Sequence, residues 1–407
     1  MPRVLRIHNR LIIGGPAINV TYLSKYMEPE FETTLVIGGK DDHEQGADYL
    51  IENLELQPVV VEEMKRKIFP LQDGIAYRKI KELIEIHKPD IVHTHAAKSG
   101  IIGRLAADAC KVPVVVHTFH GHVFHSYFNS FTTNIFINIE RYLAARSTGI
   151  VAISESQKRE LAEVYKICDP DKIKIISLGL DLDKFQINQE HKRQTFRSQY
   201  QIQDDELAIG IIGRVVSVKN HELFVAAAKN LLAKTTQKLR FIIIGDGDRR
   251  KHIETLFAEA GIAYSYVPEG YKNTTAFCTS WQTEIDKVLA GLDIVALTSH
   301  NEGTPVSLIE AQAASKPIVS TRVGGVADIM VDEKAGYITP PNDVPAFTDA
   351  LLQLVENKNL REAMSQFGKT YVQEKFSYQR LVKEMSAYYY QLLQQKGVKH
   401  SNLVTYP

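Results

Sequence analysis

Residues 294–320 carry the segment IVALTSHNEGTPVSLIEAQAASKPIVS, which decides the class of fold. An apolar run at 294–297 ends in polar residues, a helical pattern follows, and a second apolar run begins at 317. Short, wholly apolar runs are typical of strands that are buried on both faces of a parallel sheet. The segment therefore predicts a strand, a helix and a second parallel strand.

The same alternation extends through most of the chain, which at 407 residues is too long for one compact core. Further apolar runs lie at 4–7, 35–37, 59–61, 90–93, 114–117, 150–153, 173–176, 208–212 and 241–244. We therefore expect an α/β protein with an N-terminal domain at 1–190 and a C-terminal domain at 206–376. The polar stretch at 186–205 is the expected linker, and a final helix is predicted at 377–396.

Composition excludes several classes of protein. Lys plus Arg equals Asp plus Glu at 48 each, so no overall positive field favours nucleic acid. Cys110, Cys168 and Cys278 are far apart, which indicates neither a disulfide framework nor a zinc ribbon. The chain has no signal-peptide pattern and no apolar stretch of about 18 residues. We expect a cytoplasmic protein.

The opening segment also carries the strongest chemical motif, because ligands of open parallel sheets bind beyond the carboxyl ends of the strands. Pro305 suits a first helical turn, and a helix that starts there leaves the N–H groups around Thr304 to Ser307 unpaired. The carboxylates of Glu302 and Glu310 are natural partners for hydroxyl groups of a sugar or ribose. The alternative is a capping acid and a surface acid.

Two cations follow the first strand of the C-terminal half. Arg214 comes after Gly213, and Lys219 lies five residues further on. A guanidinium binds phosphate through a bidentate fork and an ammonium binds it as a mobile point charge, so the pair suits a diphosphate. A solvated basic loop is the alternative.

Two glycine motifs occupy similar strand-to-helix positions. Gly14 and Gly15 precede Pro16, so backbone N–H groups at a helix start could face a diphosphate, although a tight turn explains them equally well. Gly245 and Asp246 follow the strand at 241–244, where the glycine serves backbone geometry. Asp-x-Asp triplets at 246–248, 169–171 and 181–183 match the spacing of metal-dependent sugar transfer, but we favour capping roles.

Histidines gather where two neighbouring strands end. His93 and His95 end one strand, and His117 and His120 follow the next. A zinc site built from His117, His120, His122 and His125 is conceivable. No acidic residue lies among them, and neutral imidazoles suit a polar sugar pocket. We favour contact with sugar over metal.

Together these motifs resemble glycosyltransferase family 4, the retaining transferases of GT-B fold. The likeness covers nearly the whole chain and includes Phe185 after the Gly-Leu-Asp segment at 179–181. Segments at 93–107, 117–128 and 297–326 look like bacterial members that build cell-surface polysaccharides and other glycans. The resemblance implies two Rossmann-like domains that face a central cleft, with the C-terminal helix crossing back to the N-terminal domain.

The resemblance also implies roles for the site residues. Arg214 and Lys219 would bind the diphosphate of a nucleoside-diphosphate sugar, with Glu310 on the ribose. Glu302 and His120 would bind the transferred sugar, His120 from the opposite domain. The expected donor-binding residues are Gly14, Gly15, Gly213, Gly245, Asp246, Gly303, Thr304, Pro305, Val306 and Glu310.

The implied mechanism is front-face retention without a protein nucleophile, a cofactor or a metal. The first choice of donor is a UDP-sugar. Two positions depart from the family pattern: the segment at 271–281 replaces a short loop beside the nucleoside base, and Ser315 replaces a common glycine.

The acceptor is expected on the N-terminal domain and is a glycan or a lipid-linked glycan. There, cations mix with aromatic and aliphatic groups at 65–69 and at Tyr127, Phe128, Phe131, Ile135 and Phe136. This mixture suits peripheral contact with the inner face of a membrane, and a solvated loop beside an amphipathic helix is the alternative. The competing functions are a nucleotide-sugar 2-epimerase of similar fold, a non-catalytic sugar-nucleotide or glycan-binding protein, and a zinc hydrolase.

Overall fold

The structure is a computed structural model that describes residues 1–12, 14–40, 46–65, 67–121 and 130–398. The chain forms two compact units. The first unit contains Met1–Leu180 and Phe376–Pro407, and the second contains Asp181–Lys375. The first unit is therefore built from both ends of the chain.

The first unit is a seven-stranded parallel sheet with helices on both faces. Its strands are β1 (Arg3–His8), β2 (Glu32–Gly38), β3 (Val59–Val61), β4 (Ile91–His95), β5 (Val114–Phe119), β6 (Gly149–Ala152) and β7 (Ile173–Ile175). Its helices are α1 (Gly15–Tyr26), α2 (Asp48–Asn53), α3 (Pro70–His87), α4 (Ala97–Ala109), α5 (Ser130–Arg146), α6 (Glu155–Arg159) and α15 (Tyr378–Gln395), with short turns η1 (Glu160–Val164) and η2 (Pro170–Lys172).

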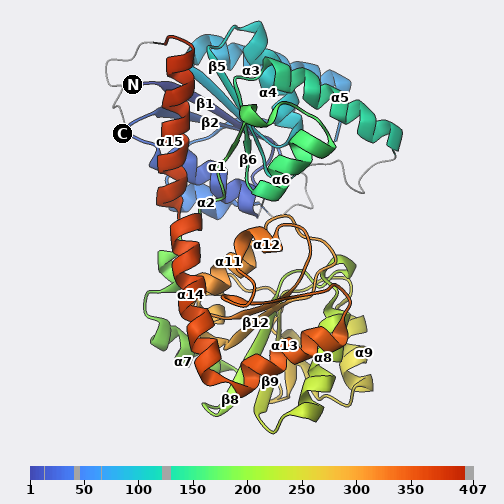
Figure 1. Cartoon of the computed structure of the whole chain (residues 1–407). Helices are drawn as coiled ribbons and strands as arrows, with labels where there is room; N and C mark the ends of the chain where they lie inside the picture. The colour runs from blue at the N-terminus through green and yellow to red at the C-terminus, as the bar shows by residue number, and fades with distance from the viewer. Residues whose placement is uncertain (13, 41–45, 66, 122–129, 399–407) are drawn as a thin grey trace. The chain divides into compact units, whose positions relative to one another are not determined.

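Alternate side chains of the first sheet enter two separate cores. Val114 and Val116 of β5 pack with α1 and α15, whereas Val115 packs with α3 and α4. Figure 1 shows α15 running alongside the first unit, and Tyr389 on this helix is fully buried. The C-terminal helix thus completes one face of the sheet formed by the N-terminal residues.

The second unit repeats the architecture with another seven-stranded parallel sheet. Its strands are β8 (Glu206–Ile212), β9 (Lys238–Ile244), β10 (Tyr264–Tyr266), β11 (Ala276–Cys278), β12 (Ile294–Leu297), β13 (Ile318–Thr321) and β14 (Gly336–Thr339). Its helices are α7 (Gln189–Gln199), α8 (His221–Lys234), α9 (Arg250–Glu259), α10 (Ile285–Gly291), α11 (Val306–Ala313), α12 (Val326–Ile329), α13 (Val344–Glu356) and α14 (Lys358–Phe376), with turns η3 (Asp183–Phe185), η4 (Ser217–Lys219) and η5 (Val267–Glu269).

The polar stretch at 186–205 is largely helical, and the second unit includes it. Its helix α7 packs against α10, and Phe196 and Arg197 are buried. Arg197 Nη1 lies 3.1 Å from Asp293 Oδ2, and Arg193 Nη2 lies 2.9 Å from Asp293 Oδ1. The segment was predicted as a linker because it is polar. In the structure its two arginines share the carboxylate of Asp293 and the ring of Phe196 is buried, so these contacts anchor the segment to the second unit.

Strand order explains where a ligand can bind in each unit. The orders are β3-β2-β1-β4-β5-β6-β7 and β10-β11-β9-β8-β12-β13-β14. The chain runs in opposite directions along the sheet from β1 and β4, and likewise from β8 and β12, so the loops that follow these strands diverge and leave room for a ligand. The motifs predicted from the sequence follow these strands, β5 and, for Gly245 and Asp246, β9.

Ser315 adopts the conformation that glycine favours, with φ 58°. Helix α11 ends with paired reverse hydrogen bonds: Lys316 N–H donates to Ala311 O and Ser315 N–H donates to Gln312 O, both at 2.9 Å. This pattern requires a left-handed residue at position 315. Serine therefore forms the same turn that a glycine would form. Replacing glycine by serine at position 315 adds local backbone strain but leaves the path of the chain unchanged.

Candidate active site

The loops that follow β8 and β12 are joined directly. Thr298 Oγ1 donates to Lys219 O at 2.9 Å, and His300 N–H donates to Val218 O at 2.8 Å. Both β8 and β12 are buried parallel strands of the same sheet, so their ends are rigid supports. The loop that carries the predicted cations is therefore held against the loop that carries Glu302.

Lys219 and Glu302 form an ion pair at this junction. Lys219 Nζ donates to Glu302 Oε1 at 2.5 Å, and Ser299 Oγ donates to the same oxygen at 2.6 Å. No described residue donates to Glu302 Oε2, although only 11% of the side chain is exposed. One carboxylate oxygen is thus fixed by the protein, and the other remains able to accept from a ligand. Sequence reasoning missed Ser299, which nothing marks in the sequence except its distance of three residues from Glu302.

A glycine pair fixes the backbone of Glu302. A Cβ atom at Gly324, where φ is 47°, would lie 1.6 Å from Glu302 O. Gly325 N–H donates to Gly303 O at 2.9 Å. No larger residue could approach the Glu302 carbonyl group so closely. The turn before α12 therefore packs directly against the backbone of the Glu302 loop and limits its movement.

The predicted glycines Gly213 and Gly245 pack backbone against backbone. A Cβ atom at Gly245 would lie 2.1 Å from Gly213 O, and one at Gly213 would lie 3.6 Å from Lys219 Cε. The stem of Lys219 therefore lies over Gly213. Arg214 follows directly; it is exposed and pairs with no other described side chain. Two cations are thus adjacent at the end of β8, one held by Glu302 and one free.

Asp246 is tied into the fold by hydrogen bonds. Its Oδ2 accepts from Tyr266 at 2.5 Å and from Ser280 at 2.8 Å, and its Oδ1 accepts from Gly247 N–H at 2.8 Å. Burial acts to raise the pKa of Asp246, but these hydrogen bonds lower it overall. Ser280 lies in the segment at 271–281, which contains β11 and belongs to the sheet. Both Asp246 oxygens are occupied in this way.

Helix α11 begins beside the ion pair. Pro305 is its N-cap residue and Val306 its first residue, one position later than the sequence predicted. Leu308 N–H donates to Pro305 O, whereas the N–H groups of Thr304, Val306 and Ser307 have no partner among the described residues. Unpaired N–H groups at a helix start favour an anion.

Glu310 is apart from the ion pair, and no hydrogen bond or ion pair joins it to the other predicted site residues that the structure describes. It is half-buried in the second turn of α11. Burial raises the pKa of Glu310 to about 7, while Lys184 acts in the opposite direction. Near neutral pH the carboxyl group can therefore either donate or accept a hydrogen bond.

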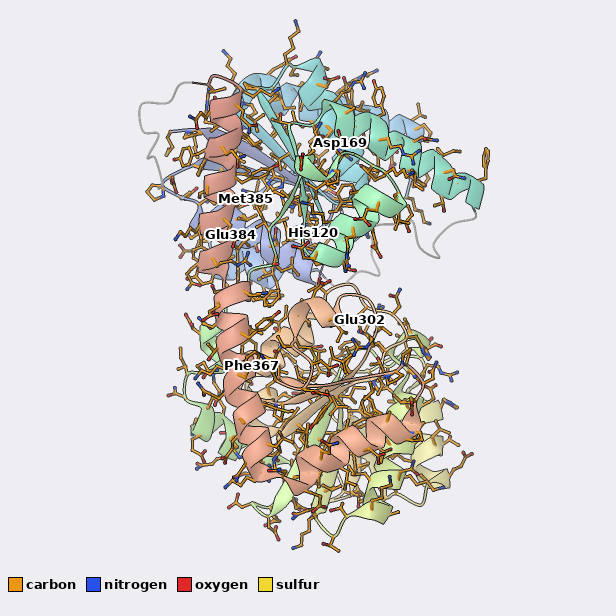
Figure 2. The ribbon with its side chains drawn as sticks, viewed as in Figure 1. His120, Asp169, Glu302, Phe367, Glu384 and Met385 are labelled. Atoms are coloured by element: carbon orange, nitrogen blue, oxygen red, sulfur yellow. The ribbon has the colours of Figure 1, made fainter. Side chains whose placement is uncertain are left out.

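The predicted residues of the first unit lie in its strand-to-helix loops. Gly14 is the N-cap of α1, with φ 155°, and Gly15 begins that helix. His120 follows β5, and its Nε2 lies 2.9 Å from His95 Nδ1. Figure 2 labels His120 in the first unit and Glu302 in the second.

The histidines do not form one cluster. His117 points to the opposite face of the sheet, where its Nδ1 lies 2.8 Å from Thr94 Oγ1. His122 and His125 lie outside the described residues. Within the described ranges, no three His, Cys, Asp or Glu side chains form a group that could hold a metal ion. The expected convergence of His117 with His93 and His95 was wrong, because alternate residues of a strand face opposite sides.

Two family models match the chain. The model described as Glycosyltransferase Family 4 matches residues 13–184, and the model described as Glycosyl transferases group 1 matches residues 192–371. The chain belongs to glycosyltransferase family 4. Glycosyltransferase activity is therefore its general function, as the sequence motifs predicted.

Named glycosyltransferases resemble this chain over most of its length. It is 28% identical over 317 residues to UDP-Gal:alpha-D-GlcNAc-diphosphoundecaprenol alpha-1,3-galactosyltransferase of Escherichia coli, covering 77% of this chain and 78% of that protein. It is 24% identical over 340 residues to the capsular polysaccharide biosynthesis glycosyltransferase CapM of Staphylococcus aureus, covering 83% and 86%.

Solved structures share the fold of this family 4 chain. Anabaena HepE, crystallised with UDP, superposes with a TM-score of 0.78 at 16% identity and covers 96% of this chain and 100% of its own. Sucrose-phosphate synthase of Thermosynechococcus elongatus gives 0.74 at 16% identity, with 97% and 100% covered. The fold is GT-B, with two Rossmann-like units, as predicted. No helix among the described residues is long and apolar enough to span a membrane.

The raised pKa of Glu310 predicts how the stability of the nucleotide-free protein depends on pH. The folded protein holds this proton up to about pH 7, whereas the unfolded chain loses it near 4.5. Between these values the folded state binds more protons, so this group makes stability fall as the pH rises. We expect Glu310→Gln to raise the urea midpoint at pH 8 relative to wild type, with a difference that shrinks toward pH 5.

Glu259→Gln, which changes an exposed carboxylate on α9, is the matched control and should leave the midpoint unchanged. A lower midpoint for Glu310→Gln than for wild type at pH 8 would contradict the raised pKa.

Proposed function

We propose that this protein transfers a sugar, with retention of anomeric configuration and without a metal, from a nucleoside-diphosphate sugar to a glycan or lipid-linked acceptor. A UDP-sugar is the first choice of donor, and bacterial surface polysaccharide is the proposed product. One observation carries the proposal: Lys219 and Glu302 are paired beside Arg214 and the unpaired N–H groups of α11.

The arrangement matches the charge that develops during transfer. As the bond between the sugar and the diphosphate lengthens, negative charge grows on the leaving phosphate oxygens. Arg214, Lys219 and the N–H groups of Val306 and Ser307 are donors for those oxygens. Lys219 and the N–H groups are held before the reaction by the Glu302 contact and by the start of α11, and the exposed side chain of Arg214 can turn toward the phosphates. Such preorganised donors lower the barrier because they need not reorient as charge appears.

Glu302 suits binding better than nucleophilic attack. Two donors share its Oε1, which reduces the electron density available for attack, and Oε2 can accept from a hydroxyl of the transferred sugar. Retention then follows from attack of the acceptor hydroxyl on the same face from which the diphosphate leaves. Since cations neutralise the diphosphate, no divalent metal is required.

Four further residues complete the proposed donor site. Glu310 binds the ribose hydroxyl groups, and its pKa of about 7 lets it accept or donate near neutral pH. His120, from the first unit, binds the transferred sugar, and Gly14 and Gly15 allow close approach of backbone to the donor. Gly213, Gly245, Asp246 and Gly303 have mainly backbone roles, because they position Lys219 and Glu302.

The relatives support the choice of substrates. The name of the E. coli relative specifies UDP-galactose as donor and a diphosphoundecaprenol-linked sugar as acceptor. The S. aureus relative is named for capsular polysaccharide biosynthesis. We propose the same chemical classes for this chain: a UDP-sugar and an acceptor whose lipid resides in a membrane.

A surface of the first unit suits contact with such a membrane. Ile68, Phe69 and Leu71 are exposed at the start of α3, and Leu71 is 87% exposed. Lys65 and Lys67 lie directly before them, so apolar and cationic groups are adjacent. Apolar groups enter the interface while lysines attract anionic headgroups. Of the other predicted residues, Phe131 and Ile135 are exposed, and Arg66, Tyr127 and Phe128 lie outside the described residues.

We expect Arg214→Ala and Lys219→Ala each to lower kcat by at least ~10²-fold, on the scale of losing one donor to a developing oxyanion. Steady-state rates with excess donor measure the effect. Lys229→Ala, which changes an exposed lysine in the second half of α8, is the matched control. Wild-type rates for both site variants would refute the assignment.

Product analysis tests the reaction itself. With a donor of known anomeric configuration and an acceptor, NMR of the product should show the same configuration, and excess EDTA should leave the rate unchanged. An inverted product would refute retention, and a rate abolished by EDTA would refute metal independence. Epimerised nucleotide sugar formed from donor alone would instead favour the 2-epimerase.

Flotation with vesicles tests the membrane surface. At low salt the protein should float with vesicles that contain anionic lipid, and Leu71→Glu should abolish flotation by placing a charge in the apolar contact. Val164→Glu changes another exposed apolar residue of the first unit and is the matched control. Failure of the wild-type protein to float at low salt would remove the proposed membrane contact.

A further inference from the structure

A buried cation lies beneath α1 and α15 in the first unit. Arg6, on β1, is fully buried, yet no acidic side chain among the described residues pairs with it. Its Nη1 instead lies 3.0 Å from His93 Nδ1, 3.4 Å from His95 Nε2 and 3.2 Å from Tyr389 Oη. Burying a guanidinium without a carboxylate is costly, and this cost calls for an explanation.

The guanidinium dictates where the protons of the neighbouring histidines lie. A guanidinium can only donate, so each ring nitrogen that faces Arg6 must present a lone pair. His93 and His95 are buried, and burial together with the nearby positive charge keeps their pKa values well below the usual range. Both rings are therefore neutral and carry one proton each. The proton of His93 lies on Nε2, which faces Thr118 Oγ1 at 2.7 Å, and the proton of His95 lies on Nδ1.

The position of the proton on His95 in turn determines where the proton of His120 lies. Their rings stack with centroids 5.2 Å apart, and His95 Nδ1 lies 2.9 Å from His120 Nε2. Because His95 Nδ1 carries a proton, His120 Nε2 accepts it as a hydrogen bond. Burial lowers the pKa of His120 to about 3, so this ring is also neutral and its own proton lies on Nδ1. That nitrogen is enclosed and has no partner among the described residues.

The backbone next to His95 is strained in a way that preserves this geometry. Ala96 has φ 68° and ψ 159°, a region that residues other than glycine rarely occupy. Ser99 Oγ donates to His95 O, which holds the carbonyl group in place. On the other side, Tyr389 of α15 hydrogen-bonds both Arg6 and His93. Figure 2 labels Met385, another α15 residue of this core.

We propose that Arg6 is a positioning residue that fixes the tautomer of His120 through His95, so that His120 presents an N–H group and not a lone pair to its ligand. The ligand atom is then a hydrogen-bond acceptor, a hydroxyl or phosphoryl oxygen of the nucleoside-diphosphate sugar. The identity of that oxygen rests on the proposed function, whereas the tautomer is a property of the free protein. His120 then serves as a donor to the sugar nucleotide and not as a general base.

Nitrogen NMR of the full chain tests the tautomer without reference to activity. Long-range ¹H–¹⁵N spectra of protein labelled at its 14 histidines distinguish protonated from bare ring nitrogens, and the signals of His120 are those lost in His120→Asn. We expect His120 to carry its proton on Nδ1. A proton on Nε2 in the wild-type protein would overturn the proposal.

Arg6→Met tests the cause of the tautomer. This change removes the cation and keeps an apolar chain of similar length, so we expect His120 to show a mixture of tautomers and the KM for donor to rise about tenfold, the effect of about 1.4 kcal/mol. Tyr389→Phe keeps the guanidinium and is expected to keep the wild-type tautomer, which separates the charge from the packing of α15. If Arg6→Met does not fold, an unaltered tautomer in Tyr389→Phe still supports the assignment to Arg6, and a changed one contradicts it.

An unchanged Nδ1–H tautomer in folded Arg6→Met would refute the role of Arg6. Absence of transfer activity in the wild-type protein would refute the proposed function alone, because the NMR result does not depend on turnover.

Discussion

The ion pair between Lys219 and Glu302 depends on the reversal of strand order at β8 and β12. Two neighbouring parallel strands end at one edge of the sheet, and the chain leaves them in opposite directions. The loops can therefore carry opposite charges to within hydrogen-bond distance while leaving space beside them. Other features support this contact: Thr298 and His300 join the loops, Gly324 fixes the backbone, and Gly213 makes room for the lysine stem.

Much of this arrangement was predictable because parallel strands have a strong sequence signal. Mostly apolar runs marked all strands of the first sheet, and Arg214, Lys219 and Glu302 were predicted as site residues because strand-to-helix loops of this fold bind ligands. The strands β10, β11 and β14 were missed. The strand β10 alternates tyrosine with serine and so gives no continuous apolar run. The strand β11 is apolar but only three residues long, and threonines flank it on both sides.

Contacts across long sequence separations were not predictable. Nothing near Arg6 indicates that Tyr389 lies against it, 383 positions later in the chain. Likewise, the sequence around Glu302 does not reveal that Gly324 approaches its carbonyl oxygen. A histidine-rich sequence also cannot show which imidazoles share a face until the strand register is known, and the register separates His117 from His93. These residues are specified by tertiary packing, which local patterns do not encode.

The helix that completes the first unit comes after the whole second unit along the chain. Residues of α15 form a large part of the core that covers one face of the first sheet, beside Val4 and Phe31. A nascent chain that has emerged as far as α14 contains the whole second unit but only part of the first. One apolar face of the N-terminal sheet therefore stays uncovered until α15 has been synthesised, while the second unit can already fold. Loss of α15, by proteolysis or premature termination, would expose a core of the N-terminal sheet and leave the second unit complete.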